Sequence, residues 1–318
     1  MVKFADHLID PIIQENPQHL WSAKGQLTQH DRLLYHYLGK TYRGLGSIID
    51  AGALVGGTTK LIASGIKSSA LIDDTKGRIH VYDLFEDSSN GPMASVIRKW
   101  FDLPELESGE RFNWLPLFES ETAEYADMIA IHPGNILEKS YSGEDIEILS
   151  VDVGKTPQLM LGVAKIFFPH LIPGKSLVVH QDYIFTLQPW LAIFMELLDG
   201  YFEKIYENQH CSAIFLAKKR ITEDQITDIC GEVAEDYYHI GNVEMLYHAI
   251  DHCTSRVAKA MLSCALAFFY SQMGQPETGR YVFRRAVVEY NITRHLMERT
   301  VIAGFARHYL GLDLSEFD

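Results

Sequence analysis

The sequence has few cysteines, and none of them forms a paired motif. Four cysteines occur in 318 residues, at positions far apart in the chain. Without a CxxC pair, neither a disulfide framework nor a zinc site is indicated. The pattern is typical of reduced, mostly buried thiols, so we expect a cytoplasmic protein. The four residues are Cys211, Cys230, Cys253 and Cys264.

Basic residues are also scarce relative to acidic ones. There are 28 Lys and Arg against 42 Asp and Glu, for a net charge of −14. Because an acidic surface repels phosphate groups, we expect neither nucleic acid nor an anionic membrane as a partner. The first residues lack the apolar core of a signal peptide, and no stretch approaches the ~20 apolar residues of a membrane span.

Along much of the sequence, short apolar runs alternate with amphipathic segments that are typical of helices. Hydrophobic residues make up 47% of the chain, which is typical of a globular protein. The runs that we interpret as strands are 47–50, 78–83, 128–132, 146–152, 176–180, 202–206 and 213–218. Apolar strands that alternate with helices predict a Rossmann-like α/β fold: a doubly wound, mostly parallel seven-stranded sheet with a C-terminal all-α extension.

Four segments follow from this pattern. Residues 1–45 are predicted to be helical, with Thr28 as the N-cap of a helix. Residues 46–219 would form the sheet domain, and 220–318 a helical C-terminal domain. Within the sheet domain, 84–127 is rich in prolines and aromatic residues and predicts a partly helical, lid-like insertion. Its aromatic side chains would either face a substrate or form the insertion's own small core.

A glycine-rich turn follows the first predicted strand. It reads Asp50-Ala-Gly52-Ala-Leu-Val-Gly56-Gly57-Thr58-Thr59. The spacing is neither GxGxxG nor that of a phosphate-binding P-loop. Glycines at a helix N-terminus let a ligand approach free backbone N–H groups, so we predict ligand binding here. Asp83 ends the second strand, where a carboxylate can accept hydrogen bonds from a ribose.

A third polar cluster follows two later strands. Asp152 ends one strand, and His180, Gln181 and Asp182 end the next. Ligands of parallel α/β sheets bind at the carboxyl ends of strands. Three interpretations stay open: a Mg²⁺ site at Asp152, Gln181 and Asp182, a proton-transfer site with Asp152 or His180 as general base, or residues that only hold the loops.

These motifs together resemble the class I S-adenosylmethionine-dependent methyltransferases, over roughly residues 30–218. They are the D-x-G-x-x-x-G-G-T-T turn, the acid after the second strand, and the block "VDV…P.LIPG..LVVHQDY". The macrocin O-methyltransferase type, which acts on sugars of macrolide and aminocoumarin antibiotics, is similar. The resemblance implies S-adenosylmethionine as cofactor and Mg²⁺ as a second one.

The resemblance also implies roles for individual residues. The turn, with Asp50, Gly52, Gly56 and Thr58, would contact the methionine part of the cofactor. Asp83 would bind the ribose, and Asn135 lies where such enzymes approach the adenine. Asp152 would lie beside the cofactor, and Asp152 and Asp182 match metal-binding acids. The chain departs from the family at Gln181, which replaces an acid, and at Lys155, which adds a positive charge nearby.

The expected function is O-methylation of a small molecule, a sugar or a glycosylated natural product. Besides Asp152 and His180, His210 lies where it could remove the proton of the acceptor hydroxyl. The alternative is a binding protein that keeps the fold, has weakened catalysis, and uses its helical domain for protein interaction. The weakened acid cluster favours this alternative.

The C-terminal region contains a segment that resembles a tetratricopeptide-type helix pair. Small and aromatic residues stand at the matching offsets: Tyr270, Gly274, Gly279, Phe283 and Ala286. One good match is fewer than the repeats that normally stand alone, so a bundle of helices is the simpler interpretation. Six arginines make this end locally basic, and we expect self-association there: Arg280, Arg284, Arg285, Arg294, Arg299 and Arg307.

Overall fold

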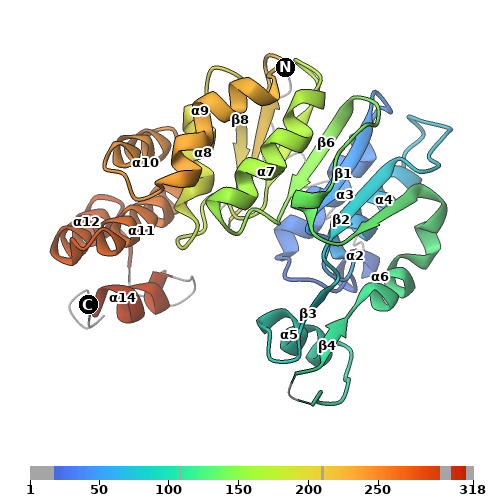
Figure 1. Cartoon of the computed structure of the whole chain (residues 1–318), viewed down its shortest axis with the longest axis horizontal. Coiled ribbons are helices and arrows are strands. Elements are labelled where there is room, and N and C mark those ends of the chain that lie inside the picture. The colour runs from blue at the N-terminus through green and yellow to red at the C-terminus, as the bar shows by residue number, and fades with distance from the viewer. Residues whose placement is uncertain (1–17, 108, 209–210, 294–301, 313–318) are drawn as a thin grey trace. The chain divides into compact units, whose positions relative to one another are not determined.

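The computed structural model describes residues 18–107, 109–208, 211–293 and 302–312 and contains a seven-stranded mixed sheet (Figure 1). The strand order is β5-β2-β1-β6-β7-β9-β8. The strands are β1 (Ser47–Ala51), β2 (Ile79–Asp83), β5 (Ile129–Pro133), β6 (Ile146–Val151), β7 (Leu177–His180), β8 (Phe202–Glu207) and β9 (Ala213–Ala217). β1 pairs in parallel with β2 and β6, β2 pairs in parallel with β5, and β8 pairs antiparallel with β9. The predicted Rossmann-like α/β fold is confirmed.

Helices connect and follow these strands. Those before β7 are α2 (Gln18–Trp21), α3 (Gln29–Thr41), α4 (Gly57–Lys67), α5 (Pro92–Trp100), α6 (Leu115–Thr122) and α7 (Pro157–Phe167). Those after it are α8 (Pro189–Leu197), α9 (Glu223–Glu235), α10 (Gly241–Asp251), α11 (Arg256–Gln272), α12 (Pro276–Glu289) and α14 (Ile302–Leu310). Short 3₁₀ turns are η2 (Ala123–Met128), η3 (Ile136–Glu138) and η4 (Phe168–His170). No helix in the described residues is long and apolar enough to cross a membrane.

The chain divides into two compact units. The first comprises Met1–Val153 and His170–Val178, and the second comprises Gly154–Pro169 and Val179–Asp318. The division does not fall near residue 219. The limits of the predicted domains, 46–219 and 220–318, therefore stay a prediction.

In the first unit, α3 begins where the sequence predicts. The Asp31 N–H donates to Thr28 Oγ1 at 3.1 Å, and the Thr28 N–H donates to Asp31 Oδ2 at 3.0 Å, which forms a capping box. α3 then packs closely on α4, because a side chain at Gly39 would collide with the Ile62 carbonyl. This contact fixes α4, whose first turn follows the glycine-rich loop after β1.

The insertion at 84–127 contains α5, α6 and η2, which confirms its partly helical character. It also holds a small antiparallel pair, β3 (Glu86–Ser88) with β4 (Arg111–Asn113). This pair was not predicted, because its three-residue strands are mostly polar. Trp114, Phe118 and Tyr125 are buried, and the Phe85 and Phe118 rings lie 5.1 Å apart. Phe118 packs on Phe85 within the insertion and also lies next to Gly56 of the turn after β1.

In the second unit, the regular elements found among the described residues after 219 are all helices, as predicted. α11 and α12 form the expected helix pair: a side chain at Gly279 would meet the Ala267 carbonyl at 2.6 Å. Phe283 and Ala286 are buried in it. Its assignment to the tetratricopeptide type stays a prediction. So does self-association, since Arg280 and Arg285 pair with acids of their own helix, and Arg294 and Arg299 lie outside the described residues.

Candidate ligand site at the ends of β1, β2 and β6

Three acids of the first unit lie at the carboxyl ends of adjacent strands. Asp50 is in register with Val81 of β2 and Ser150 of β6. Beyond it, the Gly52 N–H donates to the Tyr82 carbonyl at 2.8 Å, and the Asp152 N–H donates to the Ala51 carbonyl at 2.8 Å. Asp83 and Asp152 therefore flank the Gly52 turn. The predicted grouping of these residues at one edge is present within this unit.

Asp50 is almost fully buried, with 1% of its surface exposed. The Thr59 hydroxyl donates to its Oδ2 at 2.5 Å. Its Oδ1 is buried and has no hydrogen-bond partner among the residues that the structure describes. The pKa of Asp50 is raised to about 7: burial is the largest cause, hydrogen bonding from Thr59 opposes it, and the nearby Asp83 carboxylate adds to it. A buried acceptor without a donor is costly, so this oxygen suits a ligand's N–H group or an ordered water.

The Asp83 carboxylate is used by the chain's own backbone. The Leu54 N–H donates to Oδ2 at 2.8 Å, and the Phe85 N–H donates to Oδ1 at 2.7 Å. Leu54 and Phe85 both have positive φ angles, 53° and 56°, so the carboxylate holds two strained turns in place. Burial raises the pKa of Asp83, and the two backbone donors lower it. Two of about four lone-pair sites are filled, which leaves room for further donors.

Trp114 adds a third group near Asp83. Its indole N–H also lowers the pKa of Asp83. It is buried, however, and makes no regular hydrogen bond with the described part of the chain. Since Trp114 belongs to the insertion, the insertion reaches the predicted ribose-binding acid.

The glycines of the turn are required by close packing. Gly52 has φ 98°, and a side chain there would lie 2.9 Å from the backbone of Asp152 and Val153. Gly56 has φ 87°, and a side chain there would lie 2.6 Å from Thr122 and 3.0 Å from Phe118. The groups that approach Gly56 closely thus belong to α6, whereas the sequence pattern suggested a ligand. A cofactor contact at Gly52 or Gly56 stays a prediction.

Two other residues that were predicted to bind the cofactor, Thr58 and Asn135, lie at the start of helical turns in this unit. Thr58 is buried in the first turn of α4. Asn135 is exposed and caps η3: its Oδ1 accepts from the Leu137 N–H at 3.1 Å. The preceding Gly134 N–H donates to the Asp83 carbonyl at 2.9 Å, so this turn lies beside the Asp83 backbone. Cofactor binding by Thr58 and Asn135 stays a prediction.

The predicted Mg²⁺ site is not supported. In the second unit, Asp182 forms an ion pair with Lys155 at 2.5 Å and also accepts from the Gln188 side chain at 3.3 Å. Gln181 is mostly buried. No group of three or more His, Cys, Asp or Glu side chains that could hold a metal ion occurs in the described ranges. The residues do not fit a divalent cation, because Lys155 already neutralises the acid that was expected to bind it.

His180 lies at the end of β7 with none of its surface exposed. Neither ring nitrogen has a hydrogen-bond partner in the described part of the structure, and the ring meets Phe215 edge-on at 5.9 Å. Burial lowers the pKa of His180 to about 3. A base with so low a pKa accepts a proton poorly near neutral pH, which weakens the proposed catalytic role. His210 lies outside the described residues.

Sequence reasoning missed the main-chain donors of Leu54 and Phe85 and the indole of Trp114. No sequence signal identifies a backbone N–H that will bond an acid 29 residues away, as that of Leu54 does. Lys155 did carry a signal, since a lysine three residues after Asp152 places a cation near the acids.

Among known proteins, the chain resembles solved methyltransferase structures, at low sequence identity. No known family profile and no curated protein matches the sequence. Among solved structures, the O-methyltransferase NovP has a TM-score of 0.43 and 12% identity over 58% of this chain and 78% of its own. An O-methyltransferase from Bacillus cereus in complex with SAH has a TM-score of 0.41 and 14% identity, over 69% of this chain and 94% of its own. CalS11, a TDP-rhamnose 3'-O-methyltransferase, has a TM-score of 0.42 and 12% identity, over 68% of this chain and 96% of its own. Similarity at this level establishes neither family nor chemistry.

Proposed function

We propose that this protein is an S-adenosylmethionine-dependent methyltransferase that methylates a hydroxyl of a small molecule, a sugar or a glycosylated natural product. The observation that carries the proposal is the buried Asp50 Oδ1, which lacks a donor beside the Gly52 turn and Asp83. The sequence resemblance assigns this turn to the cofactor's methionine part and Asp83 to its ribose.

The residues present fit such a cofactor. Asp50 would accept a hydrogen bond from the amino group of the methionine part, which supplies the missing donor. Asp83 would orient the ribose through its unfilled lone pairs while still holding the Leu54 and Phe85 N–H groups. The cofactor, when bound, supplies a methyl group on a positively charged sulfur.

The acceptor must be aligned and deprotonated by the chain. Asp152 is the partly exposed acid on the other side of Gly52 from Asp83, and in this proposal it removes the proton of the acceptor hydroxyl. No step is assigned to a metal ion, because Asp182 is paired with Lys155. A role for His180 would require an opening that exposes its ring.

Calorimetric titration with S-adenosylhomocysteine tests the proposal. We expect saturable binding by the wild type, weakened in Asp83→Ala by ~1–3 kcal/mol, the scale of a lost charged hydrogen bond. Asp73→Ala is the matched control, because Asp73 is an exposed acid of the same unit. Thermal unfolding of each variant checks that it is folded. No binding by the wild type would overturn the proposal.

One observation favours the alternative of a binding protein with weakened catalysis. His180, a candidate base, is fully buried with a pKa of about 3. Transfer of a labelled methyl group to a panel of glycosylated and polyhydroxylated compounds separates the two. Cofactor binding with transfer supports the enzyme, whereas cofactor binding without transfer to any acceptor favours the binding protein.

A further inference from the structure

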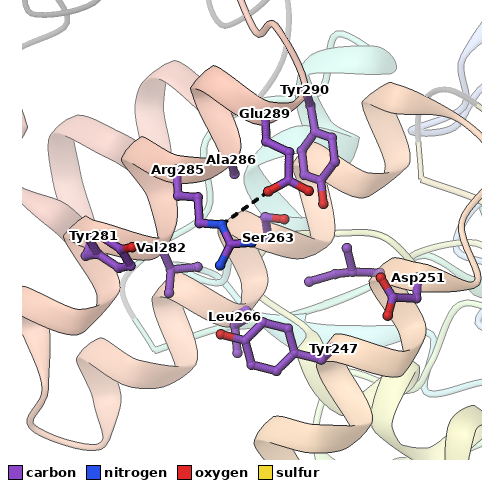
Figure 2. Close-up of a pocket in the computed structure, with 11 residues that line it drawn as sticks. Tyr247, Asp251, Ser263, Leu266, Tyr281, Val282, Arg285, Ala286, Glu289 and Tyr290 are labelled. Atoms are coloured by element: carbon purple, nitrogen blue, oxygen red, sulfur yellow. Dashed lines mark hydrogen bonds and ion pairs between the residues drawn. The ribbon is translucent and has the colours of Figure 1, made fainter.

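A small pocket opens among three helices of the second unit, α10, α11 and α12 (Figure 2). Its volume is about 110 Å³. For scale, an engineered cavity of about 150 Å³ holds one benzene molecule. The pocket therefore suits a group of the size of one amino-acid side chain. Besides Tyr281, its polar and aromatic lining residues are Tyr247, Asp251, Ser263, Arg285, Glu289 and Tyr290.

The charge in this pocket is uneven. Arg285 Nε donates to Glu289 Oε2 at 3.3 Å, one helical turn away, so these two charges compensate each other. The Asp251 carboxylate makes no hydrogen bond or ion pair within the described ranges, and it lies on the other wall (Figure 2). Burial raises the pKa of the Tyr290 phenol, and Glu289 and Asp251 raise it further, so this phenol stays neutral. One negative charge is left uncompensated.

The remaining walls are aromatic and apolar. Tyr247 and Tyr290 lie on opposite sides of the pocket (Figure 2), and the buried Ile250 and Leu266 also line it. Aromatic faces next to a carboxylate favour a cation with an apolar stem, because the ring quadrupole and the acid both attract positive charge. A neutral alcohol of the same shape would gain only the apolar contact.

We propose that this pocket binds an organic cation, an alkylammonium or guanidinium group of side-chain size. Asp251 supplies the charge, Tyr247 and Tyr290 supply the aromatic walls, and Leu266 contacts the alkyl stem. Such a group is carried by a free amine or by a basic side chain of a polypeptide. The proposal goes beyond methyl transfer and does not depend on it.

Titration of the full chain, ¹⁵N-labelled at tyrosine, with n-butylammonium tests this by following the Tyr247 and Tyr290 amide signals. We expect saturable shifts, and weaker binding in Asp251→Asn by about three- to tenfold. Asp228→Asn, which removes an exposed charge from α9, should leave the affinity unchanged. The peptide acetyl-glycyl-lysyl-glycinamide is the second probe: tighter binding than n-butylammonium assigns the site to polypeptide side chains, and weaker binding assigns it to free amines.

Three results would overturn the proposal. They are the absence of saturable shifts with both probes, equal binding of butan-1-ol, and an unchanged affinity in Asp251→Asn. Thermal unfolding of the two variants shows that each is folded. Tyr247→Leu is a second test, since it removes an aromatic wall and keeps the charge, and it should also weaken binding.

Discussion

The acids at the strand ends of the two units have different partners. In the first unit, Asp50 accepts a hydrogen bond from the Thr59 hydroxyl, and Asp83 accepts two from backbone N–H groups, all of them neutral donors. In the second unit, Asp182 is paired with the Lys155 ammonium. A carboxyl group with only neutral partners can still pair with a cationic group of a ligand, whereas Asp182 is already paired with a cation. The first unit is therefore where we place ligand binding.

The two buried titratable groups of these regions also differ in the direction of their shifts. Burial raises the pKa of Asp50 to about 7 and lowers that of His180 to about 3, because burial disfavours the charged form of either group. Each group therefore makes stability depend on pH, with opposite signs. The following variants test this contrast and the packing around it.

The largest expected effect concerns His180. Its pKa is about 3 in the folded chain against an ordinary value of 6.5, so the folded state binds fewer protons between these values. Wild-type stability is then complete above pH 6.5 and falls as pH drops towards 3. His180→Phe should remove this fall, on the order of 5 kcal/mol over the whole range. Urea unfolding across pH measures it, with exposed His248→Phe as control; equal slopes in both variants would contradict the prediction.

Asp50→Asn should show the opposite sign. The pKa of Asp50 is about 7 in the folded chain against 3.8 ordinarily, so the folded state binds the proton more tightly. Stability contributed by this proton is present below pH 3.8 and is lost as pH rises to about 7. The wild type should lose on the order of 4 kcal/mol from this source, and Asp50→Asn should not. The same urea series measures it, and a variant that follows the wild-type slope would show that Asp50 is ionised throughout.

The Gly52 turn tests whether the first unit is built by close packing. Gly52→Ala should lower the free energy of unfolding by about 2–4 kcal/mol. It places a side chain on a residue with positive φ, and that side chain collides with the backbone after β6. Gly174→Ala is the matched control: its φ is 72°, but nothing lies within 4 Å of the added carbon. It should lose only the conformational part, about 1–2 kcal/mol. Equal losses in thermal unfolding would mean that the backbone around Gly52 yields.

The smallest effect is expected from Lys155→Met. The Lys155 and Asp182 side chains are 50% and 21% exposed, so the ion pair is partly screened by water. Its loss should cost at most about 1 kcal/mol, and less at high salt. Urea unfolding at low and high salt measures this, with the more exposed pair of Lys67 and Glu124 as the comparison. A loss that grows with salt would show that the pair is not the source of the effect.

The sequence predicted the fold closely because its signals are local. The strands at 47–50 and 213–218 appear at Ser47–Ala51 and Ala213–Ala217, and Thr28 caps α3 as expected. Apolar runs and capping residues act over a few neighbours, so periodicity detects them. The β3–β4 pair was missed because its three-residue strands are mostly polar and carry no apolar pattern.

The candidate site was predictable in position and only partly in detail. The pattern placed Asp50, Asp83 and Asp152 at one edge, since strand ends of a parallel sheet meet there. It could not show that Gly56 packs against Phe118, that Asp83 binds two backbone N–H groups, or that Lys155 pairs with Asp182. Such partners are chosen in three dimensions, and one residue type fits several of them.

Because the pKa of Asp50 is raised, the heat measured for ligand binding should depend on the buffer. With a pKa of about 7, this carboxyl is partly protonated near neutral pH. A donor that reaches Oδ1 favours the ionised form and so releases a proton to the solution. The heat of binding will then differ between Tris and phosphate by the heat with which each buffer takes up that proton, and affinity will rise with pH up to about 7.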